Sequence, residues 1–143
     1  MSRPERVQPS PDVLSEPFWR AADQHILVVQ RCGACGHWQH PPSPRCHGCG
    51  GRDRLEWAPV SGKATLISWT KVLQGLVHGF KQSAPYLNLL VELDEQQGVM
   101  MVSDTAGSAL AGWEPEAGAR MRVWFEDVGG FTLPQFRPLA AAP

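Results

Sequence analysis

Four cysteines arranged as two C-x-x-C pairs constrain this chain more than any other feature. They are the only cysteines among its 143 residues: Cys32, Cys35, Cys46 and Cys49. Each pair can form a knuckle whose two thiolates point at one ion, and the segment between the pairs is long enough for the chain to turn back. Four thiolates complete the tetrahedral shell of a structural zinc site. The sequence therefore predicts one structural Zn²⁺ per chain, with no open position for water or substrate.

Other uses of these cysteines fit less well. Two disulfides would require an oxidising compartment, and the first residues of the chain show no apolar segment of a secretory signal. A redox dithiol needs only one C-x-x-C pair. Three histidines lie close enough to replace a cysteine as ligand: His37, His40 and His47. Because four thiolates already fill the shell, we expect these histidines to be surface residues.

Composition narrows the class of protein. A hydrophobic fraction of 43% is enough for a core, and a net charge of -1 gives little attraction to a polyanion. Nonspecific nucleic-acid binding, which depends on many phosphate contacts, is therefore disfavoured. No apolar run approaches the ~20 residues that cross a bilayer. Together with reduced thiols, this predicts a cytoplasmic protein.

The rest of the chain reads as a mainly β protein. Residues 1–14 have the composition of a flexible leader, a short helix begins near Ser15, and residues 15–57 hold this helix and the zinc ribbon. Beyond Gly62, alternating apolar residues predict five strands, at residues 63–72, 86–94, 99–103, 120–126 and from 131. The long connection between the third and fourth strands is typical of a five-stranded OB-fold barrel, placed at residues 58–138. Periodicity alone leaves an SH3-like barrel or a short sandwich open, and residues 139–143 read as a disordered tail.

A series of short motifs carries a family resemblance. In order they are Glu16-Pro17-Phe18-Trp19, Arg31-Cys32-x-x-Cys35-Gly36, Pro41-Pro42, Cys46-x-x-Cys49-Gly50, Leu55-Glu56-Trp57, Val60-Ser61-Gly62-Lys63, Pro85-Tyr86, Val91-Glu92-Leu93-Asp94 and Leu133-Pro134-Gln135-Phe136-Arg137-Pro138. This order resembles the acyl-CoA-associated family that has an N-terminal helix, a rubredoxin-like zinc ribbon and a C-terminal OB-fold, long labelled a domain of unknown function. The resemblance covers about residues 15–138.

The resemblance implies a role and partners. Members of the family are small accessory subunits of thiolase-fold enzymes, including thiolases, lipid-transfer-protein-type aldolases that cleave steroid side chains, and acyltransferases. Some are fused to or paired with hydratase-type proteins. The accessory subunit is thought to help bind the CoA part of an acyl-CoA or to stabilise the complex, while the partner supplies the catalytic residues.

The residues themselves offer little for catalysis. There is no G-x-S-x-G motif, and no cysteine remains as a nucleophile once zinc takes four. His25 and His78 are isolated histidines, and a lone histidine is more often a packing or surface residue than a general base. We therefore expect a non-catalytic subunit. Two alternatives stay open: a single-stranded nucleic-acid-binding OB-fold module and a free-standing enzyme.

Two sets of residues are candidates for binding. Five border the long loop 73–85, where OB-folds commonly bind ligands, and offer aromatic rings and cations for CoA: Lys71, His78, Phe80, Lys81 and Tyr86. A mobile loop with solvated lysines is the competing interpretation. Four further residues are candidates for a partner interface: Phe18 and Trp19 on the helix, and the outward-facing Arg122 and Trp124. Packing on the chain's own ribbon, or an ordinary exposed strand face, would explain these equally.

Overall fold

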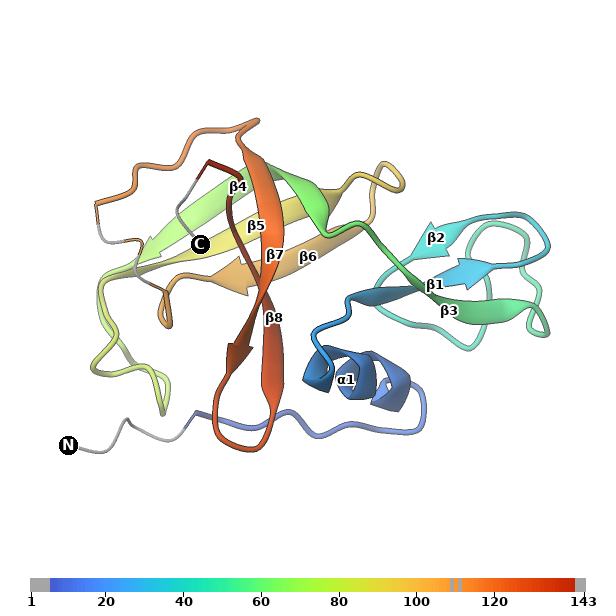
Figure 1. The fold of residues 1–143 in the computed structure, drawn as a ribbon, viewed down its shortest axis with the longest axis horizontal. Coiled ribbons are helices and arrows are strands. Elements are labelled where there is room, and N and C mark those ends of the chain that lie inside the picture. Colours follow the sequence, from blue (N-terminus) through green and yellow to red (C-terminus); the bar gives the residue numbers. More distant parts are fainter. Residues whose placement is uncertain (1–5, 109, 111, 141–143) are drawn as a thin grey trace.

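The computed structural model describes residues 6–108, 110 and 112–140 and confirms a mainly β protein with a short N-terminal helix (Figure 1). No helix in this described part is long and apolar enough to cross a membrane. The elements are α1 (Glu16–Asp23), β1 (Val28–Cys32), β2 (Trp38–Gln39), β3 (Leu55–Pro59), β4 (Lys63–Val72), β5 (Tyr86–Leu93), β6 (Met100–Asp104), β7 (Arg120–Asp127) and β8 (Thr132–Pro138).

The strands form two antiparallel sheets. The small sheet has the order β2-β1-β3 and carries the cysteines, and the large sheet has the order β6-β5-β4-β7-β8. Strand β4 pairs with β5 on one side and with β7 on the other, so the long connection after β6 crosses to the far side of β4. Figure 1 shows the two sheets at opposite ends of the molecule, with α1 beside β1 and β8. The five predicted OB-fold strands are all present.

The barrel is closed by side chains and not by a main-chain ladder. Strands β6 and β8 are the two ends of the large sheet and share no ladder. The Phe136 amide donates to Ser103 Oγ at 2.8 Å, and the Asp104 amide donates to Gln135 Oε1 at 2.9 Å. These bonds, one buried and one partly buried, satisfy main-chain donors that a closed barrel would pair strand to strand.

Element boundaries differ slightly from the prediction. The apolar run Ile26-Leu27-Val28-Val29 before the first cysteine predicts a strand from Ile26, and the strand begins at Val28. Helix α1 has eight residues, and Ser15 makes no side-chain cap to it. The Ser15 hydroxyl donates instead to Asp12 Oδ1 at 2.8 Å, so the polar side chain is used in the turn before the helix.

The core joins both sheets and the helix. Its buried members include Phe18, Leu27 and Val29 from the N-terminal part, packed with Leu66, Leu89, Val91, Leu93, Met121 and Phe136 of the OB-fold. The predicted alternation in β5 is confirmed, because Leu89, Val91 and Leu93 are all buried. In β4 an irregularity follows Leu66, beyond which the strand is largely exposed.

The segment before α1 has contacts that its composition did not predict. Arg6 Nη2 lies 3.3 Å from the buried Glu126 carboxylate, and the Arg6 guanidinium lies 4.5 Å from the centre of the Phe80 ring. Of the predicted tail, Leu139 and Ala140 are described, and the Leu139 amide donates to the Arg120 oxygen at 2.9 Å. Residues 1–5 and 141–143 lie outside the described part.

Side chains also join the zinc-ribbon part to the OB-fold. The Gln96 amide accepts from the Trp38 N–H at 2.9 Å and donates to the Trp38 oxygen at 2.8 Å. His25 Nε2 lies 3.1 Å from Asp127 Oδ1. Hydrogen bonds from Thr132 and His25 lower the pKa of Asp127. These contacts hold the two parts of the chain in one arrangement.

Candidate metal centre

The two cysteine knuckles have the same local structure. The Gly36 amide donates to the Cys32 oxygen at 2.8 Å, and the Gly50 amide donates to the Cys46 oxygen at 2.9 Å. Both glycines have positive φ, 77° and 79°, a conformation that side chains disfavour. Each turn brings its two cysteines to the same side of the backbone, as the sequence predicted.

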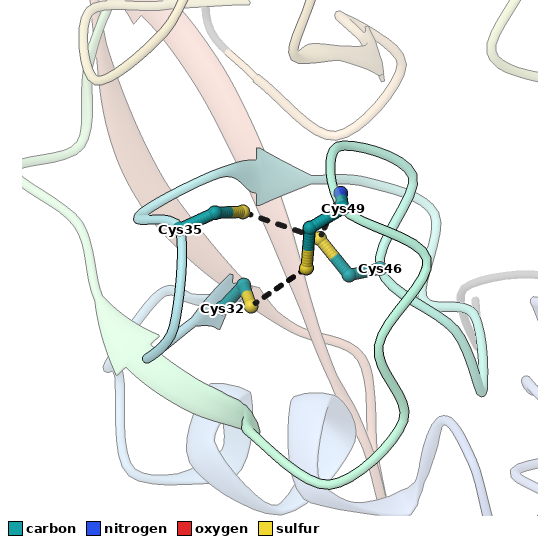
Figure 2. Close-up of side chains that lie close together, drawn as sticks. All are labelled: Cys32, Cys35, Cys46 and Cys49. Atoms are coloured by element: carbon teal, nitrogen blue, oxygen red, sulfur yellow. Dashed lines mark hydrogen bonds between the residues drawn. The ribbon is translucent and has the colours of Figure 1, made fainter.

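The four sulfur atoms converge on one point. Cys32 and Cys35 come from the end of β1 and the turn after it, and Cys46 and Cys49 from the long segment between β2 and β3 (Figure 2). All four lie within 4.8 Å of one another. The Cys32–Cys49 sulfur separation is 3.8 Å, and the Cys35–Cys46 separation is 3.6 Å.

These separations fit a tetrahedral metal site. A Zn–S bond of about 2.3 Å places tetrahedral thiolates about 3.8 Å apart, which matches both measured separations. The same distances are far longer than the S–S bond of a disulfide, about 2.05 Å. The geometry therefore supports the metal-site interpretation over the disulfide interpretation.

The thiols do not ionise equally. Amides of Cys49 and Gly48 lower the pKa of the Cys46 thiol to about 7, against the cost of burial. The His37 amide lowers the pKa of Cys35, but burial and hydrogen bonds with the other thiols outweigh it and raise the pKa to about 11. Four thiolates in one cluster thus need a bound cation to balance their charge.

Two buried glutamines hold the segment between the knuckles. Gln39 Nε2 donates to Gln30 Oε1 at 2.9 Å and to the Arg45 oxygen at 3.1 Å, and Gln39 Oε1 accepts from the His47 amide at 2.8 Å. Gln30 Oε1 also accepts from the Ser43 amide at 2.8 Å. Sequence reasoning missed both residues. The sequence signal that could have identified them is a glutamine within the apolar strand β1, at Gln30, and a second glutamine, Gln39, in the short strand paired with it.

The three neighbouring histidines are not in the cysteine cluster. His47 is exposed, as predicted, and His37 lies with its Nδ1 atom 3.4 Å from Gln96 Nε2. His40 differs from the prediction because its ring packs 5.6 Å from the Phe18 ring, and burial lowers its pKa.

The five candidate CoA residues lie in three different settings. Lys71 and Tyr86 line a groove of about 610 Å³ together with Trp69 and Trp113. The Phe80 ring lies 5.4 Å from the Tyr86 ring, under Arg6. The other two candidates, His78 and Lys81, are exposed loop residues and do not line this groove. Sequence reasoning did not identify Trp113, which follows the β6 strand after a Gly-containing connection.

The four candidate interface residues differ in how far their side chains are exposed. Phe18 is buried at 7% exposure in the chain's own core, the alternative that the sequence left open, whereas Trp19 is half-buried. Arg122 and Trp124 on β7 are half-buried and not fully outward, and the Arg137 guanidinium of β8 lies 5.9 Å from the Trp124 ring.

Comparison with known proteins agrees with this architecture. The family model described as ChsH2, rubredoxin-like zinc ribbon domain, matches residues 19–56, and that described as ChsH2, C-terminal OB-fold domain, matches residues 57–126. A solved structure titled "Ltp2-ChsH2(DUF35) aldolase" has 31% identity and a TM-score of 0.76, covering 92% of this chain and 98% of that one.

Two further relatives are more distant or much longer. A "Probable enoyl-CoA hydratase alpha subunit" of Thermomonospora curvata is 34% identical over 139 residues, which are 95% of this chain and 41% of that protein. This chain thus spans less than half of that relative. A DUF35-family protein of unknown function from Sulfolobus solfataricus shares the fold, with 18% identity, a TM-score of 0.57 and coverage of 78% of this chain and 77% of that one. From these matches, the chain belongs to the ChsH2 (DUF35) family of zinc-ribbon and OB-fold proteins.

Proposed function

We propose that this chain is a zinc-binding, non-catalytic accessory subunit of a thiolase-fold enzyme complex that acts on acyl-CoA. The observation that carries the proposal is the close match, over 92% of the chain, to the ChsH2 component of a structure titled as an aldolase with Ltp2. The T. curvata relative, named as a probable enoyl-CoA hydratase subunit, adds a second link to CoA thioesters.

The four cysteines would hold one Zn²⁺. Such an ion would cross-link the β1 knuckle to the segment before β3, because each supplies two thiolates. Since four thiolates close the coordination shell, the ion would contribute folding energy and no catalytic water. We therefore assign catalysis to the partner subunit.

The groove beside β4 and β5 is our candidate for the CoA moiety. Trp69, Tyr86 and Trp113 offer aromatic faces on which an adenine ring can stack, and Lys71 offers a cation for a phosphate. A volume of about 610 Å³ is within the range of small-molecule sites. The five residues named from the sequence remain candidates, with Lys71 and Tyr86 the best placed.

A single-stranded nucleic-acid-binding role is the alternative. The same aromatic groove would suit stacked bases, but such binding also needs a cationic track for the backbone. The net charge of -1 and the acidic Glu114 in the groove lining work against it. We expect no salt-sensitive shift of single-stranded oligonucleotides by the metal-loaded protein.

Affinity purification from the native host tests the proposal. We expect a thiolase-fold protein to co-purify with the tagged chain in near-equal amount, identified by mass spectrometry. The reconstituted pair should turn over acyl-CoA, and this chain alone should not. A chain that purifies without a partner, or that turns over acyl-CoA unaided, would contradict the proposal.

A further inference from the structure

Strand β6 meets β8 through Ser103 and Asp104, but the rest of its outer edge, at Met100–Val102, is open. It is an end strand, paired only with β5, on the side of the sheet nearer α1 in Figure 1. In an antiparallel pair, residues bonded to the partner alternate with residues whose main-chain groups point away. The Thr105 amide donates to the Leu87 oxygen at 3.0 Å, which sets this alternation. The main-chain groups of Met100, Val102 and Asp104 therefore point away from β5.

Two of these three residues have no partner for their outward main-chain groups. The Asp104 amide donates a hydrogen bond to Gln135 Oε1 at 2.9 Å. For Met100 and Val102, no such partner is present in the described part of the chain. The Val102 side chain is 70% exposed, so solvent reaches this stretch. We call Met100 and Val102 the β6 edge.

The outer edges of two other end strands, β8 and β2, are largely blocked. On β8, Pro134 and Pro138 occupy outward positions and have no N–H, and the outward Phe136 amide is bonded to a serine hydroxyl. On β2, the side-chain amide of Gln96 hydrogen-bonds both the N–H and the oxygen of Trp38. Prolines and capping side chains are the usual means of preventing strand addition. The β6 edge has neither.

A groove lies directly beside the β6 edge. It has a volume of about 520 Å³ and is formed by α1, the Pro41–Pro42 segment, β6 and β8. Phe18, Trp19, Met100 and Leu133 give it an apolar lining. Its ionisable residues are His40, whose pKa is lowered by burial, and Asp104. A ligand here meets apolar side chains on one side and unpaired main-chain groups on the other.

We propose that the β6 edge binds an extended, uncharged, apolar segment of the partner enzyme subunit, which adds to the large sheet as a sixth strand. Only a polypeptide offers alternating N–H and C=O groups at strand spacing, and its alternate side chains would occupy the groove. A free acyl chain would fill the groove and leave the edge unpaired. A polyanion would meet Asp104. This inference rests on the proposed function, because it needs a partner subunit.

Hydrogen exchange of the metal-loaded complex tests the inference directly. The probe is the thiolase-fold subunit that co-purifies with the wild-type chain. The Met100 and Val102 amides should exchange quickly in the free chain and at least about tenfold more slowly in the complex, because strand addition bonds them to the partner. Amides that exchange equally fast in both states would overturn the proposal.

A pair of substitutions tests the main-chain bond separately from side-chain packing. Val102→Pro removes the outward N–H at an edge position where proline is tolerated, whereas Val102→Ala keeps the N–H and shortens the side chain. We expect Val102→Pro to weaken subunit binding at least about tenfold and Val102→Ala by less than about threefold. Equal affinities for both variants and wild type would refute the inference.

The outcomes separate this inference from the proposed function. Complex formation with a freely exchanging β6 edge refutes strand addition but leaves the accessory-subunit role standing. Failure of the wild-type chain to bind any enzyme subunit refutes both. If Val102→Pro lowers the melting temperature of the free chain, its weaker binding could come from instability. Strand addition is then tested by the hydrogen-exchange measurement on the wild-type chain alone.

Discussion

Replacing Gln39 by methionine should weaken metal binding without touching a metal ligand. Gln39 is 3% exposed, and its amide makes three hydrogen bonds, two as donor and one as acceptor. Methionine has nearly the same length and fills the same space but makes none of these bonds. The Arg45 oxygen and the His47 amide, which are partly buried, would then lose these partners.

The magnitude follows from those lost bonds. Each buried hydrogen bond contributes about 1 kcal/mol, and an unsatisfied buried group costs about 1–3 kcal/mol. Gln39→Met should therefore lower the free energy of unfolding by about 2–3 kcal/mol, because two of its three bonds reach groups that are only partly buried. Because His47 lies between Cys46 and Cys49, part of this loss falls on the second knuckle. Residues that orient ligands typically change metal affinity about 10–100-fold when removed.

Chelator competition and denaturant unfolding measure the two effects. Metal affinity is titrated against a chromogenic chelator, and unfolding is followed with saturating metal present. The matched control is Gln97→Met, since Gln97 is exposed and should change neither quantity. If Gln39→Met kept its metal affinity within about twofold of wild type, the claim that Gln39 positions the second knuckle would be wrong.

Three further predictions concern the metal, pH and the CoA groove. Cys46→Ser should abolish stoichiometric zinc and unfold the ribbon, because metal binding and folding are linked; full zinc content by elemental analysis together with an unchanged near-UV spectrum would contradict this. Burial lowers the pKa of His40 below its ordinary value of 6.5, so the unfolded chain takes up this proton first as pH falls. Its contribution to stability is therefore full above about pH 6.5 and declines below it; His40→Phe should reduce that loss in denaturant midpoints at pH 7.5 and 5.5, whereas exposed His78→Phe should not. Lys71→Glu should weaken the complex's affinity for acyl-CoA about tenfold, and Lys81→Glu should weaken it less, because Lys71 lines the groove and Lys81 does not; calorimetric titrations that rank them the other way would move the site into the loop.

Features set by local spacing could be predicted from the sequence. The positions of Cys32, Cys35, Cys46 and Cys49, with a glycine after each pair, determine the two knuckle turns, because the hydrogen bond that closes each turn joins residues only four apart. The same holds for β5, where alternate apolar residues need one buried face. At the two knuckles and in β5, the structure that the local sequence pattern predicts is the structure that the folded chain adopts.

Features set by long-range side-chain contacts could not be predicted. Arg6 lies 120 residues from Glu126, and Gln96 lies 58 residues from Trp38. Nothing in the local sequence of either pair indicates its partner. For the same reason, Arg6 was read as part of a flexible leader, and the closure of the barrel through Gln135 was not foreseen.

Three glutamine side chains of this fold bind main-chain groups in the same way. Gln39, Gln96 and Gln135 each present a primary amide to main-chain groups that lack a strand or turn partner. A primary amide carries the same donor and acceptor as a peptide group, so it can stand in for a missing strand. Glutamate at Gln96 would accept from the Trp38 N–H but could not donate to the Trp38 oxygen. The identity of the amide, and not only its polarity, therefore determines whether both main-chain groups of Trp38 on the β2 edge are blocked.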